Sequence, residues 1–356
     1  MKTTNARKNK IGLREIAAAA NVSVATVSRV LNGNNRVDPS IQKVVLDVAA
    51  SLDVDLSQRN KTKALAFLLS NRAPLHDFHS RILTGAEAYC AAHGWDIVFL
   101  SYNYPPNVPW KELHLPRVLQ RRDVVRAVIL AGTNSSNLME LLDHKGIPAV
   151  VLGNNVVGDV RNYKICDVIF SDDVQGSIDM TLHLLAQGHK DIWYVGNNRL
   201  PWFARCFDGY CQTMKNAGFP IRYSGIDSED DLEIGYLGTK LLMGRGEKVT
   251  AIFAGNDATA RGVYKALRER GKNIPEDISV VGCDGTVGSL LYPALTTIRE
   301  FPEQIGKQMV EMILNRIAKP GMAQQTVTIP TELVKRDSCD PISVASNTYS
   351  DDALRV

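Results

Sequence analysis

The organisation of this chain is decided by the stretch Asn21-Val22-Ser23-Val24-Ala25-Thr26-Val27-Ser28-Arg29-Val30-Leu31-Asn32-Gly33. Val27, Val30 and Leu31 recur at helical spacing and predict an amphipathic helix over residues 24–31. Ser23 is its expected N-cap, because a serine hydroxyl can accept a hydrogen bond from the free N–H groups of the first turn. The opposite face carries two hydroxyls and a guanidinium, which suit phosphate oxygens and guanine edges better than a merely solvated surface would.

Short helices are expected on both sides of this stretch. Leu13, Ile16 and Ala17 begin an apolar stripe that predicts a helix before it, and Asp38-Pro39 is a typical start for a helix after it. Two short helices joined by a tight turn and followed by a third form a helix-turn-helix, whose second helix can enter the major groove. From apolar spacing alone, a helical hairpin that binds no DNA is equally expected. The polar outer face favours DNA binding.

Charge is divided unevenly along the 356 residues, a length that predicts two or three domains. Residues 1–63 contain 11 basic and five acidic side chains, a net charge of +6, while the remainder has a net charge of −3. A small basic module therefore precedes a large, mildly acidic one, and the basic module is suited to a polyanion such as DNA.

Composition excludes several other classes of protein. With 45% hydrophobic and 22% charged residues, the chain is neither disordered nor fibrous. Its six cysteines lack zinc-ligand spacing and are expected to be reduced thiols. The N-terminus does not resemble a secretory signal, and no apolar run approaches the ~18 residues of a membrane helix. We therefore expect a cytoplasmic protein without a membrane partner.

From residue 64 onwards, short apolar runs alternate with helical segments, which is typical of an α/β fold with buried parallel strands. The runs cover residues 64–69, 96–100, 127–131, 149–152, 168–170, 192–195, 251–254 and 279–281. Glycine-rich nucleotide motifs and the G-x-S-x-G motif of hydrolases are absent from the sequence. This argues against an enzyme, and we expect neither catalytic residues nor a cofactor.

The segments Leu13-Arg14-Glu15-Ile16-Ala17 and Asn21 to Gly33 closely resemble the headpiece of the lactose-repressor (LacI/GalR) family of bacterial regulators. The resemblance implies DNA-binding roles for seven residues, of which the first three would read bases and the other four would contact phosphates. They are Val24, Ala25 and Arg29, followed by Ser23, Thr26, Ser28 and Asn32. Because Val24 and Ala25 are apolar, they can sense thymine methyl groups, which leaves Arg29 as the main polar reader.

The segment after the headpiece departs from that family. The family's hinge wedges a leucine into the minor groove, but residues 54–63 lack this leucine and the Pro-Asn that precedes it. Since an apolar wedge is what unstacks and bends a duplex, we expect this linker to tether the headpiece without kinking DNA. The predicted domains are a headpiece at 1–53, an atypical hinge at 54–63, a core at 64–340 and a tail at 341–356.

The resemblance continues through the core, where it implies two periplasmic-binding-protein-like lobes joined by three crossovers. Landmarks are Gly188-His189, Ala254-Gly255-Asn256-Asp257 and Pro293-Ala294-Leu295-Thr296-Thr297. Lobe one is expected at 64–167 and 298–328, and lobe two at 168–297 and 329–340. A small-molecule effector would bind in the cleft between the lobes, at the carboxyl ends of the strands.

Three effector-binding residues follow from the resemblance: Arg205, Asn256 and Asp284. A guanidinium, an amide and a carboxylate together suit a sugar. Asn256 is equally expected as a helix cap. The family usually has a second acidic residue after Asp284, whereas this chain has Gly285, which leaves the effector's identity open.

Four further residues are candidates for the cleft. Trp202 and Phe203 offer ring faces that suit the C–H face of a sugar or a planar base, or they anchor a loop on the lobe. Asp173 and Gln175 follow an expected strand, and Asp172 or Asp173 can equally cap the next helix. His76 and His79 stand three apart without a third ligand at suitable spacing, so we expect no metal site.

These patterns predict a DNA-binding transcriptional repressor whose operator affinity is modulated by a small molecule, a sugar or sugar derivative by family default and otherwise a purine-like compound. A symmetric homodimer is expected, with contacts from Arg81–Ala92, including Ile82, Leu83, Ala86 and Tyr89. A coiled-coil tetramerisation helix is not expected in the tail. The alternatives are a cytoplasmic sugar-binding protein without regulatory DNA binding and an α/β enzyme.

Overall fold

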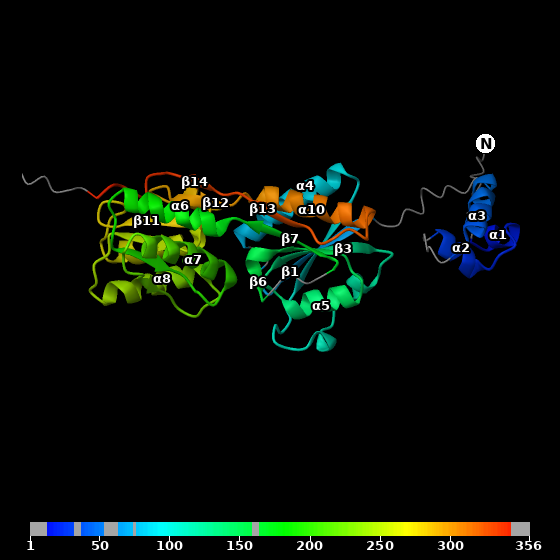
Figure 1. Cartoon of the computed structure of the whole chain (residues 1–356), viewed down its shortest axis with the longest axis horizontal. Coiled ribbons are helices and arrows are strands. Elements are labelled where there is room, and N and C mark those ends of the chain that lie inside the picture. Colours follow the sequence, from blue (N-terminus) through cyan, green and yellow to red (C-terminus); the bar gives the residue numbers. More distant parts are fainter. Residues whose placement is uncertain (1–12, 32–36, 53–62, 74–75, 159–163, 343–356) are drawn as a thin grey trace, which may run out of the picture. The chain divides into compact units, whose positions relative to one another are not determined.

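The computed structural model describes residues 13–31, 37–52, 63–73, 76–158 and 164–342 (Figure 1). The chain divides into an N-terminal unit and a larger unit that begins at Ala64. Asn32, most of the linker and most of the C-terminal tail lie outside the described residues. In the part of the chain that is described, no helix is long and apolar enough to span a bilayer.

The N-terminal unit contains the three expected helices, α1 (Leu13–Ala19), α2 (Val24–Leu31) and α3 (Pro39–Ser51). The predicted caps are confirmed. The Thr26 N–H donates to Ser23 Oγ at 3.0 Å, and the Ser40 N–H donates to Asp38 Oδ1 at 2.8 Å. The helices meet in a small aliphatic core of Ile16, Ala17, Ala20, Val27, Val30, Val45 and Ala49. Because these side chains are small, the unit's stability depends on close packing of all three helices.

The described residues of the larger unit form two six-stranded sheets and a short third one. The first sheet has the order β13-β7-β5-β3-β1-β2, and the second β14-β12-β11-β10-β8-β9. In the first, the strands are β1 (Ala64–Ser70), β2 (Asp96–Tyr102), β3 (Val125–Gly132), β5 (Ala149–Leu152), β7 (Cys166–Ser171) and β13 (Thr326–Ile329). In the second, they are β8 (Ile192–Val195), β9 (Tyr223–Ser224), β10 (Ala251–Ala254), β11 (Ser279–Asp284), β12 (Thr296–Arg299) and β14 (Glu332–Val334). The predicted α/β core with parallel sheets is confirmed, although β14 runs antiparallel to β12.

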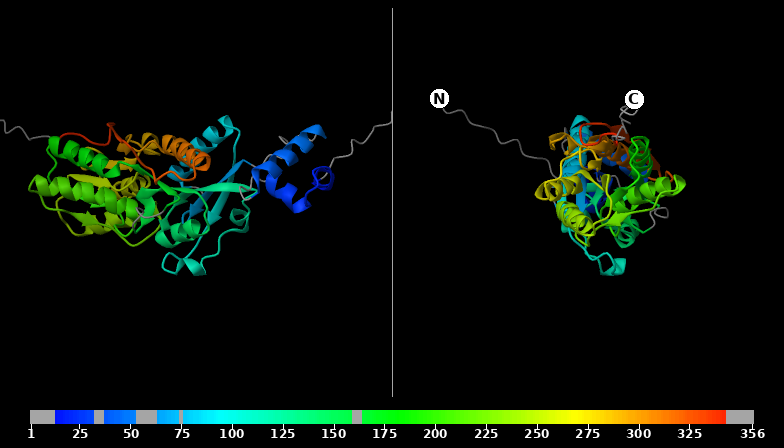
Figure 2. Two further views of the ribbon diagram at one scale, coloured as in Figure 1. Left: turned by 45° about the vertical axis from the view of Figure 1, so that its right-hand side comes forward. Right: turned by 90° about the vertical axis from the view of Figure 1, so that its left-hand side faces the viewer.

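Helices cover both faces of each sheet (Figures 1 and 2). The first sheet is covered by α4 (Asp77–Ala92) and α10 (Pro302–Ala318) on one face and α5 (Ser136–His144) on the other. In the second lobe, α6 (Asp173–Ala186) and α7 (Pro201–Asn216) share one core, while α8 (Asp231–Gly244) and α9 (Asp257–Glu269) share another. The minor elements are β4 (Asn134–Ser135), β6 (Val156–Val157), η2 (Trp110–Glu112), η3 (Arg117–Gln120), η4 (Gly153–Asn155) and η5 (Gly288–Leu290).

The chain passes between the two lobes three times, but not at the predicted residues. It crosses after β7, after β12 and after β13, since the element that follows each of these strands belongs to the other lobe. Residues 168–171 were expected in lobe two, yet they lie in the first sheet because β7 pairs with β5. Residues 298–299 complete β12 in the second sheet, and residue 329 completes β13 in the first. The three crossovers therefore lie one to four residues later in the chain than the sequence predicted, because each strand extends further.

Helix α4 packs tightly against α10 through glycines. A Cβ added at Gly85 would lie 2.0 Å from the Glu303 carbonyl oxygen, and one at Gly306 would lie 2.0 Å from that of Ile82. This close approach requires residues without side chains. Ile82 and Ala86 are fully buried in the core of the same lobe. Their expected role in dimer contacts is therefore wrong, because these side chains are already covered by their own chain.

A buried ion pair joins two distant segments of lobe one. Arg316 on α10 donates to both carboxylate oxygens of Asp167 on β7, at 2.7 and 2.6 Å, and the two side chains are 1% and 0% exposed. The guanidinium also donates to the carbonyl oxygens of Met322 and Ala323, so the turn after α10 is held against β7. A bidentate pair with these further acceptors leaves little of either charge uncompensated.

We predict that Arg316→Ala lowers the free energy of unfolding by about 3–5 kcal/mol, because it leaves the Asp167 carboxylate buried without its cation. The matched control is Arg121→Ala, which removes an arginine paired with Asp123 where both side chains are more than 60% exposed. That change should leave the free energy of unfolding almost unchanged, because solvent screens the exposed pair. Urea denaturation measures both variants, and equal losses for the two would contradict this account.

Candidate functional site

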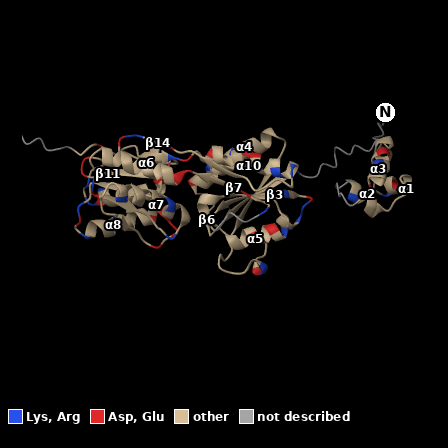
Figure 3. Cartoon of the chain, viewed as in Figure 1, with Lys and Arg blue, Asp and Glu red and all other residues tan. Residues whose placement is uncertain are grey.

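The outer face of α2 presents the residues predicted to contact DNA. Val24 is 42% exposed, and Ala25 and Arg29 are exposed as well. Arg29 is the one charged residue in this helix (Figure 3). The hydroxyls of Ser23 and Thr26 lie 2.8 Å apart at its N-terminus, and Ser28 is half-buried. The arrangement places two apolar side chains and a guanidinium on one accessible surface, with hydroxyls beside the free N–H groups of the first turn.

A second candidate site is a cavity between the two lobes. Both lobes contribute to its wall, which contains Arg72, His76, Phe78, His79, Asn154, Asn155, Asp173, Trp202, Cys206, Gly255, Asn256, Asp284 and Glu300. Its volume is about 30 Å³, which is room for only a few water molecules. A larger cavity of about 530 Å³ lies beside it and shares Arg72 and Trp202. In this arrangement of the lobes, these two side chains limit the space for a ligand.

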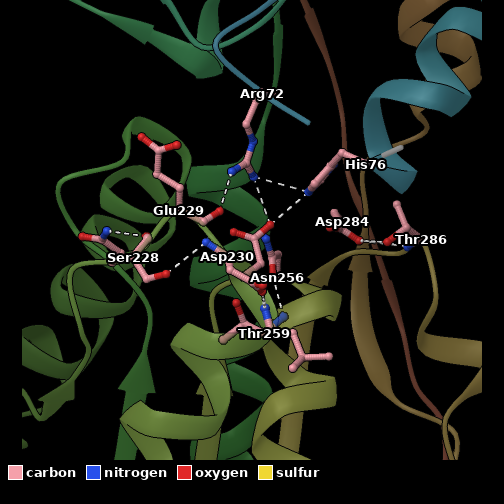
Figure 4. Close-up of polar contacts among 12 residues, drawn as sticks. Arg72, His76, Ser228, Glu229, Asp230, Asn256, Thr259, Asp284 and Thr286 are labelled. Atoms are coloured by element: carbon pink, nitrogen blue, oxygen red, sulfur yellow. Dashed lines mark hydrogen bonds and ion pairs between the residues drawn. The ribbon is translucent and has the colours of Figure 1, made fainter. Parts of the chain in front are cut away.

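An ion pair between the lobes holds the cavity narrow (Figure 4). Arg72, which follows β1 in lobe one, donates to Asp231 Oδ2 at 3.0 Å and to the Glu229 carbonyl oxygen at 3.1 Å in lobe two. His76 Nε2 lies 2.9 Å from the same Asp231 oxygen. The Arg72 guanidinium also stacks 4.3 Å above the centre of the Trp202 ring. Because the side chains of Arg72 and Asp231 are only 7% and 5% exposed, separating the lobes requires breaking a desolvated ion pair.

Asp284 occupies a strained position at the end of β11. Its φ of 88° is uncommon for a residue with a side chain, and Oδ1 accepts hydrogen bonds from the Thr286 N–H and hydroxyl at 2.9 and 2.6 Å. Burial and the neighbouring Asp257 raise the pKa of Asp284 well above its usual range. At the next residue, a Cβ on Gly285 would lie 2.9 Å from Arg299 Cα. The backbone here therefore has no room for a second acidic side chain.

Glu300 lies on the second crossover between the lobes, directly after β12. Burial and the nearby Asp173 raise its pKa to about 7. One carboxylate oxygen accepts a hydrogen bond from Cys283 Sγ at 3.4 Å. Asp257, behind the cavity wall, also has its pKa raised, to about 6, by burial, but its oxygens accept from Thr297 Oγ1 and from the N–H groups of Val287 and Gly288. The cavity is thus bordered by acidic groups that burial makes costly to ionise.

Two parts of the chain match known families. Residues 12–53 match the family described as "Bacterial regulatory proteins, lacI family", and residues 181–339 match a "Periplasmic binding protein-like domain". The matched segments contain α2 and most of lobe two. The chain therefore contains a segment that matches the lacI family and a segment that matches a periplasmic-binding-protein-like domain. The match at residues 12–53 includes Arg29 and its neighbours on α2.

Curated relatives of the chain are regulators of transcription. It is 27% identical over 343 residues to the HTH-type transcriptional regulator RegA of Clostridium saccharobutylicum, covering 92% of this chain and 98% of the relative. It is 29% identical over 317 residues to the HTH-type transcriptional repressor PurR of Glaesserella parasuis serovar 5, covering 86% and 89%.

Solved structures of similar fold include regulators bound to sugars and to DNA. The transcriptional regulator CelR in complex with cellobiose matches with a TM-score of 0.67 and 23% identity, over 92% of this chain and 99% of that one. The lac repressor dimer bound to operator and the anti-inducer ONPF matches with a TM-score of 0.67 and 23% identity, over 93% and 100%. An Enterococcus faecium regulator with bound ribose matches with a TM-score of 0.66 and 24% identity, over 79% and 100%. These likenesses show that the two-lobed fold is shared.

The structure changes the position expected for Arg205. Its guanidinium does not line the cavity but pairs with Asp173, Nη2 to Oδ1 at 2.6 Å, where the two side chains are 33% and 2% exposed. The next residue, Cys206, lines the cavity instead, because successive side chains on α7 point in different directions. Arg205 Nε and Nη2, which were expected to donate to a ligand, thus donate to the carboxylate of Asp173.

Two other expected cleft residues do not reach the cavity. Phe203 is fully buried in the core of lobe two, against Gly196 and Gly255, and anchors the start of α7. Gln175 is exposed and donates to Asp179 one turn further along α6. Trp202 lines both cavities and Asp173 lines the smaller one, as expected from their positions. The cap of α6 is Asp172, which accepts from the Gln175 N–H.

Asn256 caps a helix, which was the alternative to a ligand contact, and it also lines the cavity. It is the N-cap of α9, with Oδ1 accepting from the Thr259 N–H at 2.7 Å. Several residues of the cavity wall were not predicted from the sequence, among them Arg72, Phe78, His79 and Glu300. Glu300 could have been predicted from its position, since it directly follows the strand β12. Within the described segments, no three His, Cys, Asp or Glu side chains are arranged to hold a metal ion.

We predict that Arg205→Ala destabilises the protein by about 2–3 kcal/mol, because Asp173 would remain buried without a cation. The control is the double variant Arg205→Ala with Asp173→Asn, which removes the stranded charge and should recover at least half of the loss. Urea denaturation followed by tryptophan fluorescence measures both. If the single variant is as stable as the parent, the pair is not a structural contact.

Proposed function

We propose that this chain is a transcriptional repressor that binds a specific operator through α2 and senses a small molecule in the cavity between its lobes. The observation that carries the proposal is the exposed guanidinium of Arg29 on a capped helix within residues 12–53, the segment that matches the lacI family. The proposal assigns binding to the chain and no chemical reaction. Such a regulator acts where bacterial DNA is found, in the cytoplasm.

The proposed reading of DNA uses two kinds of contact. Arg29 donates two hydrogen bonds to O6 and N7 of a guanine, and Val24 and Ala25 contact thymine methyl groups in the major groove. Ser23, Thr26 and Ser28 contact phosphates, which position the helix without carrying sequence information. In this proposal Asn32, which lies outside the described residues, adds a further phosphate contact.

We propose a homodimer that reads two half-sites of a pseudo-palindromic operator, since a two-fold axis in the protein requires one in the DNA. Support comes from an open groove along α4 and the edge strand β2, lined by Leu83, Glu87, Trp95, Ile97 and Phe99 among others. Phe99 in this groove is 42% exposed, and an apolar side chain exposed beside other apolar residues favours contact with a partner surface. The buried Ile82 and Ala86 have no part in this interface.

The proposed response to the effector depends on the crossovers. Asp173 follows the first crossing and Glu300 lies on the second, and both line the cavity. Because the space is narrow, a ligand as large as a sugar must displace Arg72 from Asp231 and change the lobe angle. The change would shift operator affinity through a coupling free energy of about 1–3 kcal/mol. The cellobiose and ribose bound to structural relatives support a sugar or sugar derivative as the effector.

We predict that Arg29→Ala reduces affinity for the operator about 10- to 100-fold, while binding to unrelated DNA changes little. The expected loss corresponds to one bidentate base contact of about 1–3 kcal/mol. The operator is first selected from random duplexes with the parent protein, and gel shifts then compare the variants at fixed salt concentration.

The matched control for this test is Arg14→Ala, which removes an exposed arginine on α1 of the same unit. We expect Arg14→Ala to keep the preference for the selected operator over a scrambled duplex. If Arg29→Ala keeps that preference equally well, α2 is not the reading helix.

A further inference from the structure

Two carboxyl groups in the cavity wall lack a cation. Asp284 and Glu300 are 6% and 8% exposed, and among the described residues neither forms an ion pair with a lysine or arginine. The two arginines nearest the cavity are already paired, Arg72 with Asp231 and Arg205 with Asp173. When Asp284 and Glu300 ionise, the cavity therefore carries two negative charges that no described residue pairs directly, and burial makes each of them costly.

The remaining wall offers rings and unused polar atoms. Phe78 and Trp202 supply aromatic surfaces, which attract cations as well as apolar groups. His79 is 3% exposed, and its Nδ1 has no hydrogen-bond partner among the described residues. Burial lowers the pKa of His79 well below its usual value, with His76 and Arg72 adding to the effect, so its ring is neutral and can accept a hydrogen bond. The Trp202 Nε1–H, also buried without a partner in that part of the chain, can donate one to a hydroxyl.

We propose that the cavity takes a small hydroxylated amine, whose protonated nitrogen is held by the carboxyl groups of Asp284 and Glu300. This inference rests on the proposed function and specifies its effector. The ammonium would supply the cation that the wall lacks, and its N–H groups match the acceptors present. An anionic ligand would meet two buried carboxylates, and a neutral sugar would leave their charge uncompensated.

The proposal implies a dependence on pH. The titratable groups that face Glu300 are Asp173 on α6, Arg205 and Cys206 on α7, and Cys283 and Asp284 on β11. The raised pKa of Glu300 means that its contribution to stability is complete at acidic pH and is lost as the pH rises through about 7. Above that pH the ligand-free protein contains an unfavourable buried carboxylate, and an ammonium would relieve this cost.

The first experiment needs no ligand. At pH 8, Glu300→Gln should raise the melting temperature of the ligand-free protein by about 2–4 °C, because it removes a buried charge while keeping the shape of the side chain. The gain should disappear at pH 5. The matched control is Glu269→Gln, which changes an exposed glutamate on α9 and should leave the melting temperature unchanged at both pH values. A Glu300→Gln variant less stable than the parent at pH 8 would show that the carboxylate is compensated within the protein and overturn the proposal.

The second experiment uses matched pairs of ligands. Thermal shifts at pH 7.5 compare glucosamine with glucose, galactosamine with galactose and mannosamine with mannose, with glucose 6-phosphate as the anion. We expect at least one amine to stabilise the protein more than its neutral partner, and Asp284→Asn and Glu300→Gln each to weaken its binding about tenfold or more, as loss of a charged hydrogen bond predicts. Glu269→Gln should bind it as the parent does.

The outcomes separate this inference from the proposed function. If a neutral sugar or the phosphate stabilises the protein and the amines do not, the ligand class is wrong while the effector cavity stands. If no amine stabilises the protein at millimolar concentration, the proposal that the ligand is a hydroxylated amine is also wrong. Failure of the parent protein to select any operator sequence would overturn the repressor assignment instead, whatever the amines do.

Discussion

The arrangement of the larger unit depends on one constraint, which is that a single chain builds two sheets and must pass between them three times. Each passage begins where a strand ends, so the residues that follow β7 and β12 are brought to the boundary between the lobes. Asp173 and Glu300 are placed there by chain connectivity. A ligand that touches them touches the segments about which the lobes can move, and this is how binding in a small cavity can alter a large arrangement.

Charge compensation sets the character of the cavity. Arg205 and Arg72 each have an aspartate partner within the protein, and Arg316 has another deep in lobe one. Among the described residues of the cavity wall, Asp284 and Glu300 are the carboxyl groups that these pairs leave without an ion-pair partner. Buried charges are usually paired, and groups that remain unpaired concentrate at functional sites. The strained backbone of Asp284 fits the same interpretation, since strain persists where the surrounding structure holds it in place.

The N-terminal unit and the larger unit are stabilised by different interactions. The N-terminal unit has a small aliphatic core and a helix whose outer face is left for a partner, so its specificity depends on very few side chains. The larger unit has extensive aromatic and aliphatic cores and two ion pairs that fix its segments. Its functional surface is internal, between lobes that Arg72 and Asp231 hold together. The residues proposed to bind DNA and those proposed to bind a small molecule therefore lie in separate units, and each set can be substituted without changing the other.

The sequence alone determined the features that local periodicity and capping encode: the helix over residues 24–31 with its Ser23 cap, the start of α3 at Pro39 and the α/β character of the core. The family resemblance indicated Asp284 and Asn256 as residues near a cleft, while Trp202 was indicated by its aromatic ring in a loop and Asp173 by its place after a strand. The tertiary structure decided what each side chain faces. Arg205 pairs with Asp173, Phe203 enters the core and Glu300 enters the cavity, since these outcomes depend on helix rotation and on groups more than 30 residues away in the chain.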